Sequence, residues 1–148
     1  MRREGLPCIF YGDLYGTQGP HAEPAACKGK LPALILSRKI FAYGEQTDYF
    51  ESRTSIGWIR HGTWDRVDGC AVIMSIGGAA KSTMLVGADK AGQTWTDVLG
   101  NCGEAVVINE RGYGAFACAS RSVSVYVRND APGREQFAAC CDPGRFVS

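Results

Sequence analysis

Short runs of β-branched and aromatic residues, separated by glycine, constrain this chain more than any other feature of its sequence. They recur between residues 55 and 128 at spacings of about 8–12 residues, and no helical periodicity interrupts them. The last run alternates cleanly, because Val125 and Val127 fall on one face while Ser124 and Tyr126 fall on the other. Such runs indicate an antiparallel β-sandwich. They are SIGWIR (55–60), CAVIMSI (70–76), STMLVG (82–87), TWTDVL (94–99), AVVIN (105–109), YGAFAC (113–118) and VSVYVR (123–128).

The region before the sandwich has a different pattern. Residues 5–16, GLPCIFYGDLYG, begin as an apolar run typical of a buried strand and then become polar. A loop rich in Gly, Pro and Ala follows, and residues 30–44 predict a helix with Pro32 in its first turn and Gly44 at its C-terminal end. One strand and one helix form a single β–α unit, which is not a fold on its own.

The C-terminal region contains Pro-Gly pairs at 132–133 and 143–144, and we expect a flexible tail there. The chain therefore divides into a β–α unit (1–44), a sandwich (45–129) and a tail (130–148). The adjacent Cys140 and Cys141 could form a redox switch, although neighbouring thiols in a tail more often have no structural role.

Composition excludes several function classes. The chain has 16 Lys and Arg against 15 Asp and Glu and no basic stripe, so we expect no nucleic-acid partner. No run approaches the roughly 20 apolar residues that span a bilayer, so we expect no membrane role, and no secretory leader is recognisable. The seven cysteines form no C-x-x-C pair, which favours reduced thiols in a cytoplasmic protein over a zinc or redox site.

Several ordered motifs point to a known family. Residues 5–12, GLPCIFYG, fit the pattern G-x-P-x-x-x-Y-G, and residues 42–50 read AYGEQTDYF. The later motifs are IGW (56–58), AGQTWTD (91–97), VIN (107–109), GYG (112–114) and SVSVYV (122–127). In this order they resemble the C-terminal part of a glycoside hydrolase family 13 α-amylase, of the liquefying bacterial and intracellular fungal type. The resemblance implies the last β–α unit of an incomplete (β/α)8 barrel followed by domain C, a Greek-key sandwich.

The resemblance implies endo-hydrolysis of α-1,4-glucans as the parent activity, but we expect no catalytic residue in this chain. Retaining cleavage uses two carboxyl groups roughly 5–5.5 Å apart. In the family, the catalytic residues lie at the ends of barrel strands four, five and seven, which precede the first residue here. No Asp or Glu of the chain lies in a matching motif, so a structural role is expected.

Asp13 and Tyr15 follow the expected barrel strand at its C-terminal end, where such barrels build active sites. They are candidates for the wall of a substrate cleft. The alternative, that Asp13 caps the loop and Tyr15 packs, is favoured.

Asp48 is the candidate metal ligand. The resemblance implies a calcium ion between barrel and domain C, bound by a His-Asp pair and a later aspartate, but here the pair reads Thr47-Asp48 and the later position is Ile76. Because calcium takes about 6–8 oxygen ligands, we expect the site to be lost and Asp48 to be a turn residue. No other cofactor is expected.

Trp64, in the turn HGTWD (61–65), is the candidate for stacking on a sugar ring. Trp58 and Trp95 lie inside strand patterns and are predicted to be buried or half-buried.

Two hypotheses of different class remain open. In the first, the chain is the C-terminal segment of an α-amylase, acts structurally, and has the remainder of the barrel or a second copy of itself as partner. In the second, it is a stand-alone β-sandwich that binds carbohydrate, such as an α-glucan, or another partner. In either, residues 7–11 expose a strand edge that must dock, pair with another chain or fray.

Overall fold

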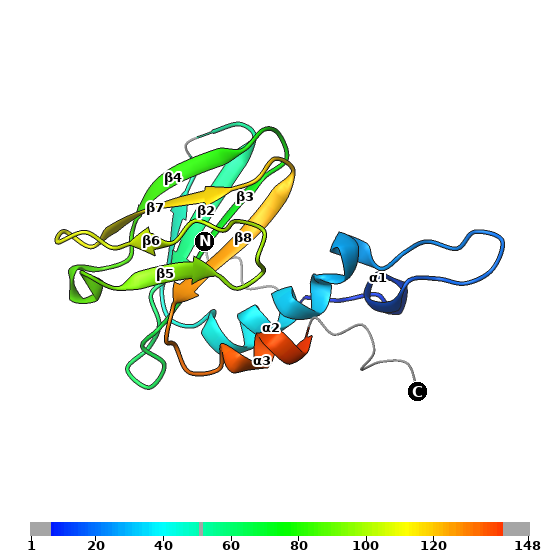
Figure 1. Ribbon diagram of the computed structural model, residues 1–148, viewed down its shortest axis with the longest axis horizontal. Helices are drawn as coiled ribbons and strands as arrows, with labels where there is room; N and C mark the ends of the chain where they lie inside the picture. The colour runs from blue at the N-terminus through cyan, green and yellow to red at the C-terminus, as the bar shows by residue number, and fades with distance from the viewer. Residues whose placement is uncertain (1–6, 51, 141–148) are drawn as a thin grey trace.

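The computed structural model describes residues 7–50 and 52–140 and contains two antiparallel β-sheets (Figure 1). The larger sheet has six strands in the order β1-β2-β3-β8-β5-β6, and the smaller sheet pairs β4 with β7. Each predicted run overlaps one of these strands, which confirms the sandwich. The strands are β1 (Gln46–Tyr49), β2 (Ser55–Arg60), β3 (Cys70–Ser75), β4 (Ala80–Leu85), β5 (Thr94–Asp97), β6 (Val106–Val107), β7 (Tyr113–Cys118) and β8 (Ser122–Arg128). The helices are α1 (Tyr11–Tyr15), α2 (Leu31–Phe41) and α3 (Glu135–Cys140), with 3-10 turns η1 (Ala26–Gly29) and η2 (Ala88–Lys90).

The main core lies between the two sheets and is organised around three aromatic side chains. Trp95, Phe116 and Tyr126 are fully buried. The Phe116 ring packs edge-on against the other two, with centroid distances of 6.1 Å to Trp95 and 5.2 Å to Tyr126. Aromatic pairs in this geometry contribute about 0.5–1.5 kcal/mol each beyond their buried area. The rest of this cluster consists mainly of aliphatic residues: Ile59, Ala71, Ile73, Met84, Val86, Val106 and Ile108.

Strand β8 is buried on both of its faces. Tyr126 points into the main core, whereas Val125 and Val127 join a second cluster that includes Phe41 of α2 and Phe137 of α3. The predicted alternation of β8 is therefore correct. The face that looks polar in the sequence is nevertheless inside the protein, because the β4–β7 pair covers it, while α2 and α3 cover the valine face of the same sheet.

Helix α2 confirms the predicted helix with Pro32 in its first turn, although it ends at Phe41 rather than at Gly44, and it provides this cover. Its buried stripe is Ala33, Ser37 and Phe41, spaced by one helical turn. The Lys30 ammonium, just before the helix, donates to the Leu99 carbonyl oxygen at 2.7 Å and so fixes the start of α2 to the end of the sheet. Among the described residues, no helix is long and apolar enough to cross a membrane.

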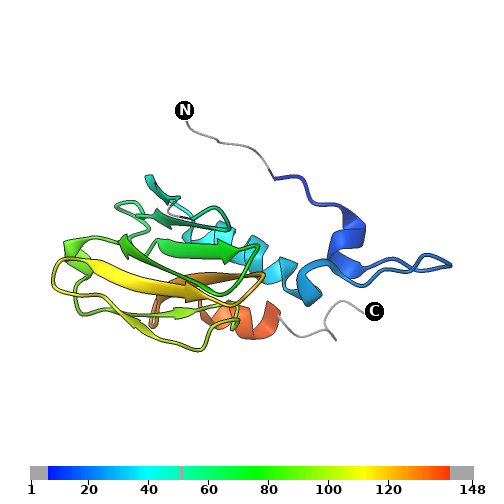
Figure 2. The same cartoon turned by 90° about the horizontal axis from the view of Figure 1, so that it is seen from above.

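The opening segment differs from its prediction as a strand. Pro7 to Phe10 are exposed and lie outside any strand, and Tyr11–Tyr15 form the short helix α1; Gly5 and Leu6 lie outside the described residues. In both views α1 and the loop after it extend away from the sandwich (Figures 1 and 2). A strand needs a neighbour for its backbone hydrogen bonds, and the described part of the chain offers this segment none.

The segment after β8 also differs from the flexible tail expected over 130–148. Residues 135–140 form helix α3, and both Ala131 and Phe137 are buried. Phe137 stacks on Phe41 at a centroid distance of 6.2 Å. The Arg134 guanidinium donates to the Thr96 hydroxyl at 2.7 Å. These contacts attach α3 to α2 and β5, while Cys141 and the rest of the predicted tail lie outside the described residues.

Replacing Phe137 by alanine tests whether α3 is part of the fold. We expect Phe137→Ala to lower the free energy of unfolding by about 3 kcal/mol, because it removes the stacked ring and leaves a cavity against Phe41. Urea unfolding followed by circular dichroism measures the change. The exposed neighbour Gln136→Ala is the control, and equal effects of the two substitutions would contradict the docked position of α3.

Candidate functional site

Asp13 and Tyr15, the predicted cleft-wall residues, lie in helix α1 and are exposed to solvent. The Tyr15 ring packs on the Tyr11 ring at a centroid distance of 4.6 Å. Helix α1 contacts η1 and α2, and both ribbon views place it far from the loop between β2 and β3 that carries Trp64. The structure therefore does not bring these two residues together with Trp64, and their cleft role stays a prediction.

Asp48, the predicted calcium ligand, lies within strand β1 rather than in a turn, opposite Trp58 of β2. Its exposed carboxylate accepts a hydrogen bond from the Gln46 side-chain amide at 2.6 Å. Thr47 forms a hydrogen bond of 2.8 Å with the His61 ring, and the side chain of Ile76 offers no oxygen. Within residues 7–50 and 52–140, no three His, Cys, Asp or Glu side chains gather as metal ligands. These surroundings do not fit a calcium ion.

Trp64 is held at the tip of a structured turn. Residues 61–69, which we call the Trp64 loop, connect β2 to β3, and the Trp64 side chain is 92% exposed. The backbone groups of Thr63 and Arg66 form two reciprocal hydrogen bonds of 2.8 and 3.1 Å around it. The Thr63 hydroxyl donates to the Asp65 carboxylate at 2.7 Å, which is the main reason why the pKa of Asp65 lies below its usual value.

Three contacts attach the Trp64 loop to the rest of the protein. The Arg66 guanidinium lies over the Tyr43 ring, 4.1 Å from its centroid. The Asp68 carboxylate pairs with Arg128 of β8 at 3.0 Å. The Lys90 ammonium is nearly buried and donates to the His61 carbonyl oxygen at 3.0 Å, and burial is the main cause that lowers the pKa of Lys90. The loop is therefore fixed at both ends.

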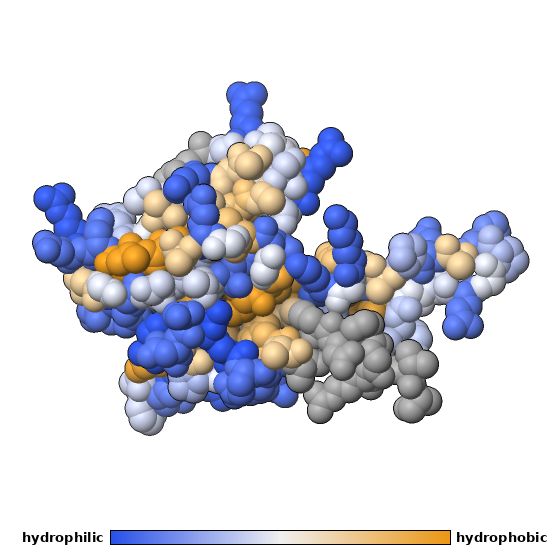
Figure 3. All heavy atoms as spheres, in the orientation of Figure 1, coloured by the Kyte–Doolittle hydropathy of each residue, from blue (hydrophilic) through white to orange (hydrophobic). Residues whose placement is uncertain are grey.

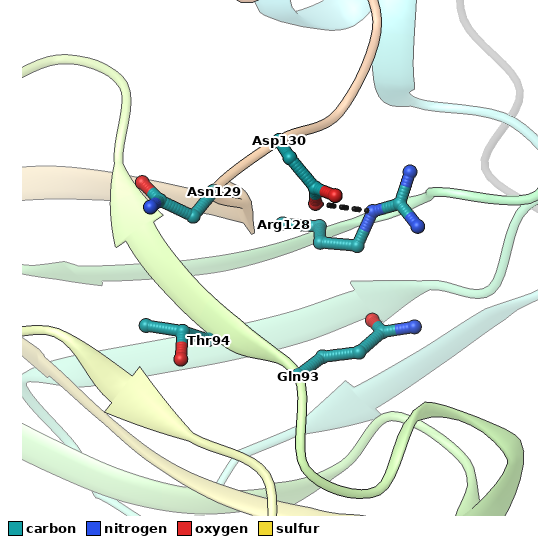
Figure 4. Close-up of a pocket in the computed structure, with 5 residues that line it drawn as sticks. All are labelled: Gln93, Thr94, Arg128, Asn129 and Asp130. Atoms are coloured by element: carbon teal, nitrogen blue, oxygen red, sulfur yellow. Dashed lines mark ion pairs between the residues drawn. The ribbon is translucent and has the colours of Figure 1, made fainter.

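A shallow polar groove lies where β5 begins and β8 ends. It has a volume of about 330 Å³. Figure 4 shows the side chains of Gln93 and Arg128 extending to one side of β5, with those of Thr94 and Asn129 on the other. Arg128 pairs with Asp130 at 3.0 Å in addition to Asp68. No single motif contains all of these residues, which come from two distant segments, so sequence reasoning missed the groove.

Asp97, at the end of β5, is the one buried carboxylate among the described residues. One of its oxygens accepts hydrogen bonds from the backbone N–H groups of Leu99 and Val125, and the other accepts from those of Asn101 and Cys102, all at 2.9–3.0 Å. An aspartate that bonds the N–H two residues later is typical of a turn. The sequence Asp-Val-Leu-Gly could therefore have indicated this residue, but the bond to Val125 could not be foreseen.

The five cysteines whose side chains the structure describes are free thiols in different surroundings. Cys8 and Cys27 are exposed, Cys102 is half-buried, and Cys70 and Cys118 are buried. Burial raises the pKa of Cys70 to about 12, so this thiol stays protonated and unreactive at neutral pH. Cys140 ends helix α3, while Cys141 lies outside the described residues, so the predicted redox role of this pair remains a prediction.

Comparison with known proteins finds α-amylases as relatives. Residues 72–127 match the family described as α-amylase C-terminal. The chain is 42% identical over 129 residues to an α-amylase of Bacillus licheniformis, a match that covers 86% of this chain and 25% of that protein. It is 39% identical over 138 residues to the cytoplasmic α-amylase of Escherichia coli (strain K12), covering 86% of this chain and 27% of that protein. The chain thus spans about a quarter of the length of these curated relatives.

Solved structures also match part of the chain, among them an α-amylase from Malbranchea cinnamomea. This α-amylase is 12% identical and superimposes with a TM-score of 0.47. The match covers 67% of this chain and 21% of that one.

Replacing Asp97 by alanine tests the role of its carboxylate. We expect Asp97→Ala to lower the free energy of unfolding by about 3 kcal/mol or more, because it leaves buried N–H groups without acceptors. Urea unfolding measures the change. The exposed Glu110→Ala is the control and should stay within about 0.5 kcal/mol of the natural chain; a similarly small effect at Asp97 would contradict the assignment.

Proposed function

We propose that this chain, of which residues 72–127 match the α-amylase C-terminal family, acts as the C-terminal scaffold of an α-amylase. In this proposal the complete enzyme cleaves α-1,4-glucans internally, and the sandwich supports its barrel without taking part in the chemistry. We propose the cytoplasm as its location, because the related E. coli protein is named a cytoplasmic α-amylase.

The observation that carries the proposal is the engagement of Asp97. A retaining glycosidase needs one carboxylate free to attack and a second, with a raised pKa, free to donate a proton. Burial in a low-dielectric site is the usual way to raise such a pKa. Asp97 is the buried carboxylate of the described chain, and its two oxygens already accept four backbone hydrogen bonds. It therefore stabilises the fold and is not available to a substrate.

The expected partner is the remainder of the barrel. Phe10 and Tyr11 are 71% and 72% exposed, and Tyr15 and Ile9 are 48% and 36% exposed. This cluster of large apolar side chains on one short segment is surface that a partner would bury. Association of two copies through the same segment is the alternative outcome, and analytical ultracentrifugation of the pure chain distinguishes it.

A chimera with the Bacillus licheniformis α-amylase tests the scaffold role. In the chimera, the C-terminal quarter of the Bacillus licheniformis enzyme is replaced by the matching residues of the present chain. We expect the chimera to be soluble and to hydrolyse starch, because the sandwich and α2 supply the same supporting surfaces. The same relative truncated at the junction should lose activity, since the apolar exterior of its barrel is then exposed.

The chimera that carries Asp97→Ala is the matched control. It should be inactivated at a lower temperature than the unmodified chimera, while its activity at low temperature is retained. A folded, soluble chimera without hydrolytic activity would contradict the scaffold role.

A further inference from the structure

We propose that the polar groove at the β5–β8 end and the neighbouring Trp64 together form a binding site for a segment of α-1,4-linked glucan. The identity of the sugar rests on the proposed function, whereas the position of the site rests on the geometry of the described residues. The site would add glucan binding to the supporting role of the sandwich.

The Trp64 ring is exposed to solvent on an ordered loop. An indole that is 92% exposed keeps a large apolar face in water. The Trp64 loop holds it there through the Thr63–Arg66 backbone pair and the Arg66–Tyr43 contact, so the ring does not collapse onto the sandwich. Because the loop is already ordered, its backbone loses little conformational entropy when a ligand stacks on the ring.

The surroundings of the Trp64 ring suit a ligand with both apolar and polar groups. The neighbours of Trp64 in the turn, Asp65 and Arg66, are exposed and charged. Val67 of the same loop is also exposed, at 58%, so the loop presents a small apolar surface between charged groups rather than the broad apolar patch typical of a protein interface. Figure 3 shows apolar surface gathering elsewhere on this face, over β6 and between β5 and the helices. A pyranose ring has an apolar face and hydroxyl groups around its rim, which match a platform of this kind.

The groove is lined by polar side chains that can bind sugar hydroxyls. Its walls offer both donors and acceptors: the guanidinium of Arg128, the carboxylate of Asp130 and the amides of Gln93 and Asn129. The Gln93 amide oxygen accepts a hydrogen bond from the Trp95 indole at 3.1 Å, which fixes the orientation of that amide. The backbone N–H of Asn129 donates to the Thr94 carbonyl oxygen at 2.8 Å and holds the two walls together. Sugar hydroxyls both donate and accept, and they fit this mixture.

The Trp64 loop and the groove are adjacent in the structure. Asp68 of the Trp64 loop pairs with Arg128, which lines the groove, so the loop borders the groove directly. In Figure 1 the loop between β2 and β3 projects below the start of β5 and the end of β8. In the proposed complex, the ring on the loop and the hydrogen-bonding groups of the adjoining groove contact different glucosyl units of one chain.

Titration of the full 148-residue chain with maltoheptaose, by calorimetry and by tryptophan fluorescence, tests the proposal. We expect binding with a blue shift of the emission, because Trp95 is buried and Trp64 is the exposed indole that becomes covered. Trp64→Ala should weaken binding by about tenfold or more, which corresponds to about 1.4 kcal/mol. Asp130→Ala should weaken it to a smaller extent. Phe50→Ala removes another exposed aromatic outside the loop and should bind like the natural chain.

Each other result decides against the site. Absence of binding at millimolar maltoheptaose, undiminished binding by Trp64→Ala, or equal binding of cellohexaose would overturn the assignment. Thermal unfolding of each variant establishes that it is folded before binding is measured. These failures differ from failure of the proposed function, which would appear as an inactive chimera whether or not the chain binds glucan.

Discussion

The carboxylate of Asp97 is the interaction on which the arrangement of the molecule depends. Its bond to the Val125 N–H joins the end of β5 to β8, and its bonds to Asn101 and Cys102 shape the loop after β5. That loop in turn presents the Leu99 carbonyl oxygen to Lys30, at the start of α2. One buried carboxylate therefore connects the sheet to the helix that covers its second face. Its burial does not destabilise the fold, because four backbone N–H groups replace the water molecules that it loses.

The covering helices determine which surfaces are left for function. Because α2 and α3 bury the outer face around β3 and β8, and the β4–β7 pair buries the inner face, the centre of the larger sheet has no free surface. Binding groups can then gather at the ends of strands, on segments held by a rigid framework. The Trp64 loop and the groove lie at one such end. The proposed carbohydrate site and the proposed scaffold role are both compatible with this layered packing.

The sequence predicted what depends on local pattern and missed what depends on distant partners. The alternation of β8 and the start of α2 at Pro32 are local, and both predictions are confirmed, although α2 ends at Phe41, before the predicted Gly44. The run at 7–10 has the composition of a strand, but pairing decides strand formation and the described chain supplies no neighbour. Phe137 lies in a segment rich in glycine and charge, and its burial depends on Phe41, almost a hundred residues earlier. The groove likewise requires Gln93 and Arg128 to meet, which only the β5–β8 pairing produces.

We propose that this chain contributes support to an amylase but no cleavage chemistry of its own. The most direct test is release of reducing ends from soluble starch by the purified 148-residue chain, with the Bacillus licheniformis α-amylase as positive control. We expect no release of reducing ends above the buffer blank at any concentration of the chain. Release that rises with the amount of chain and follows its peak through gel filtration would contradict it.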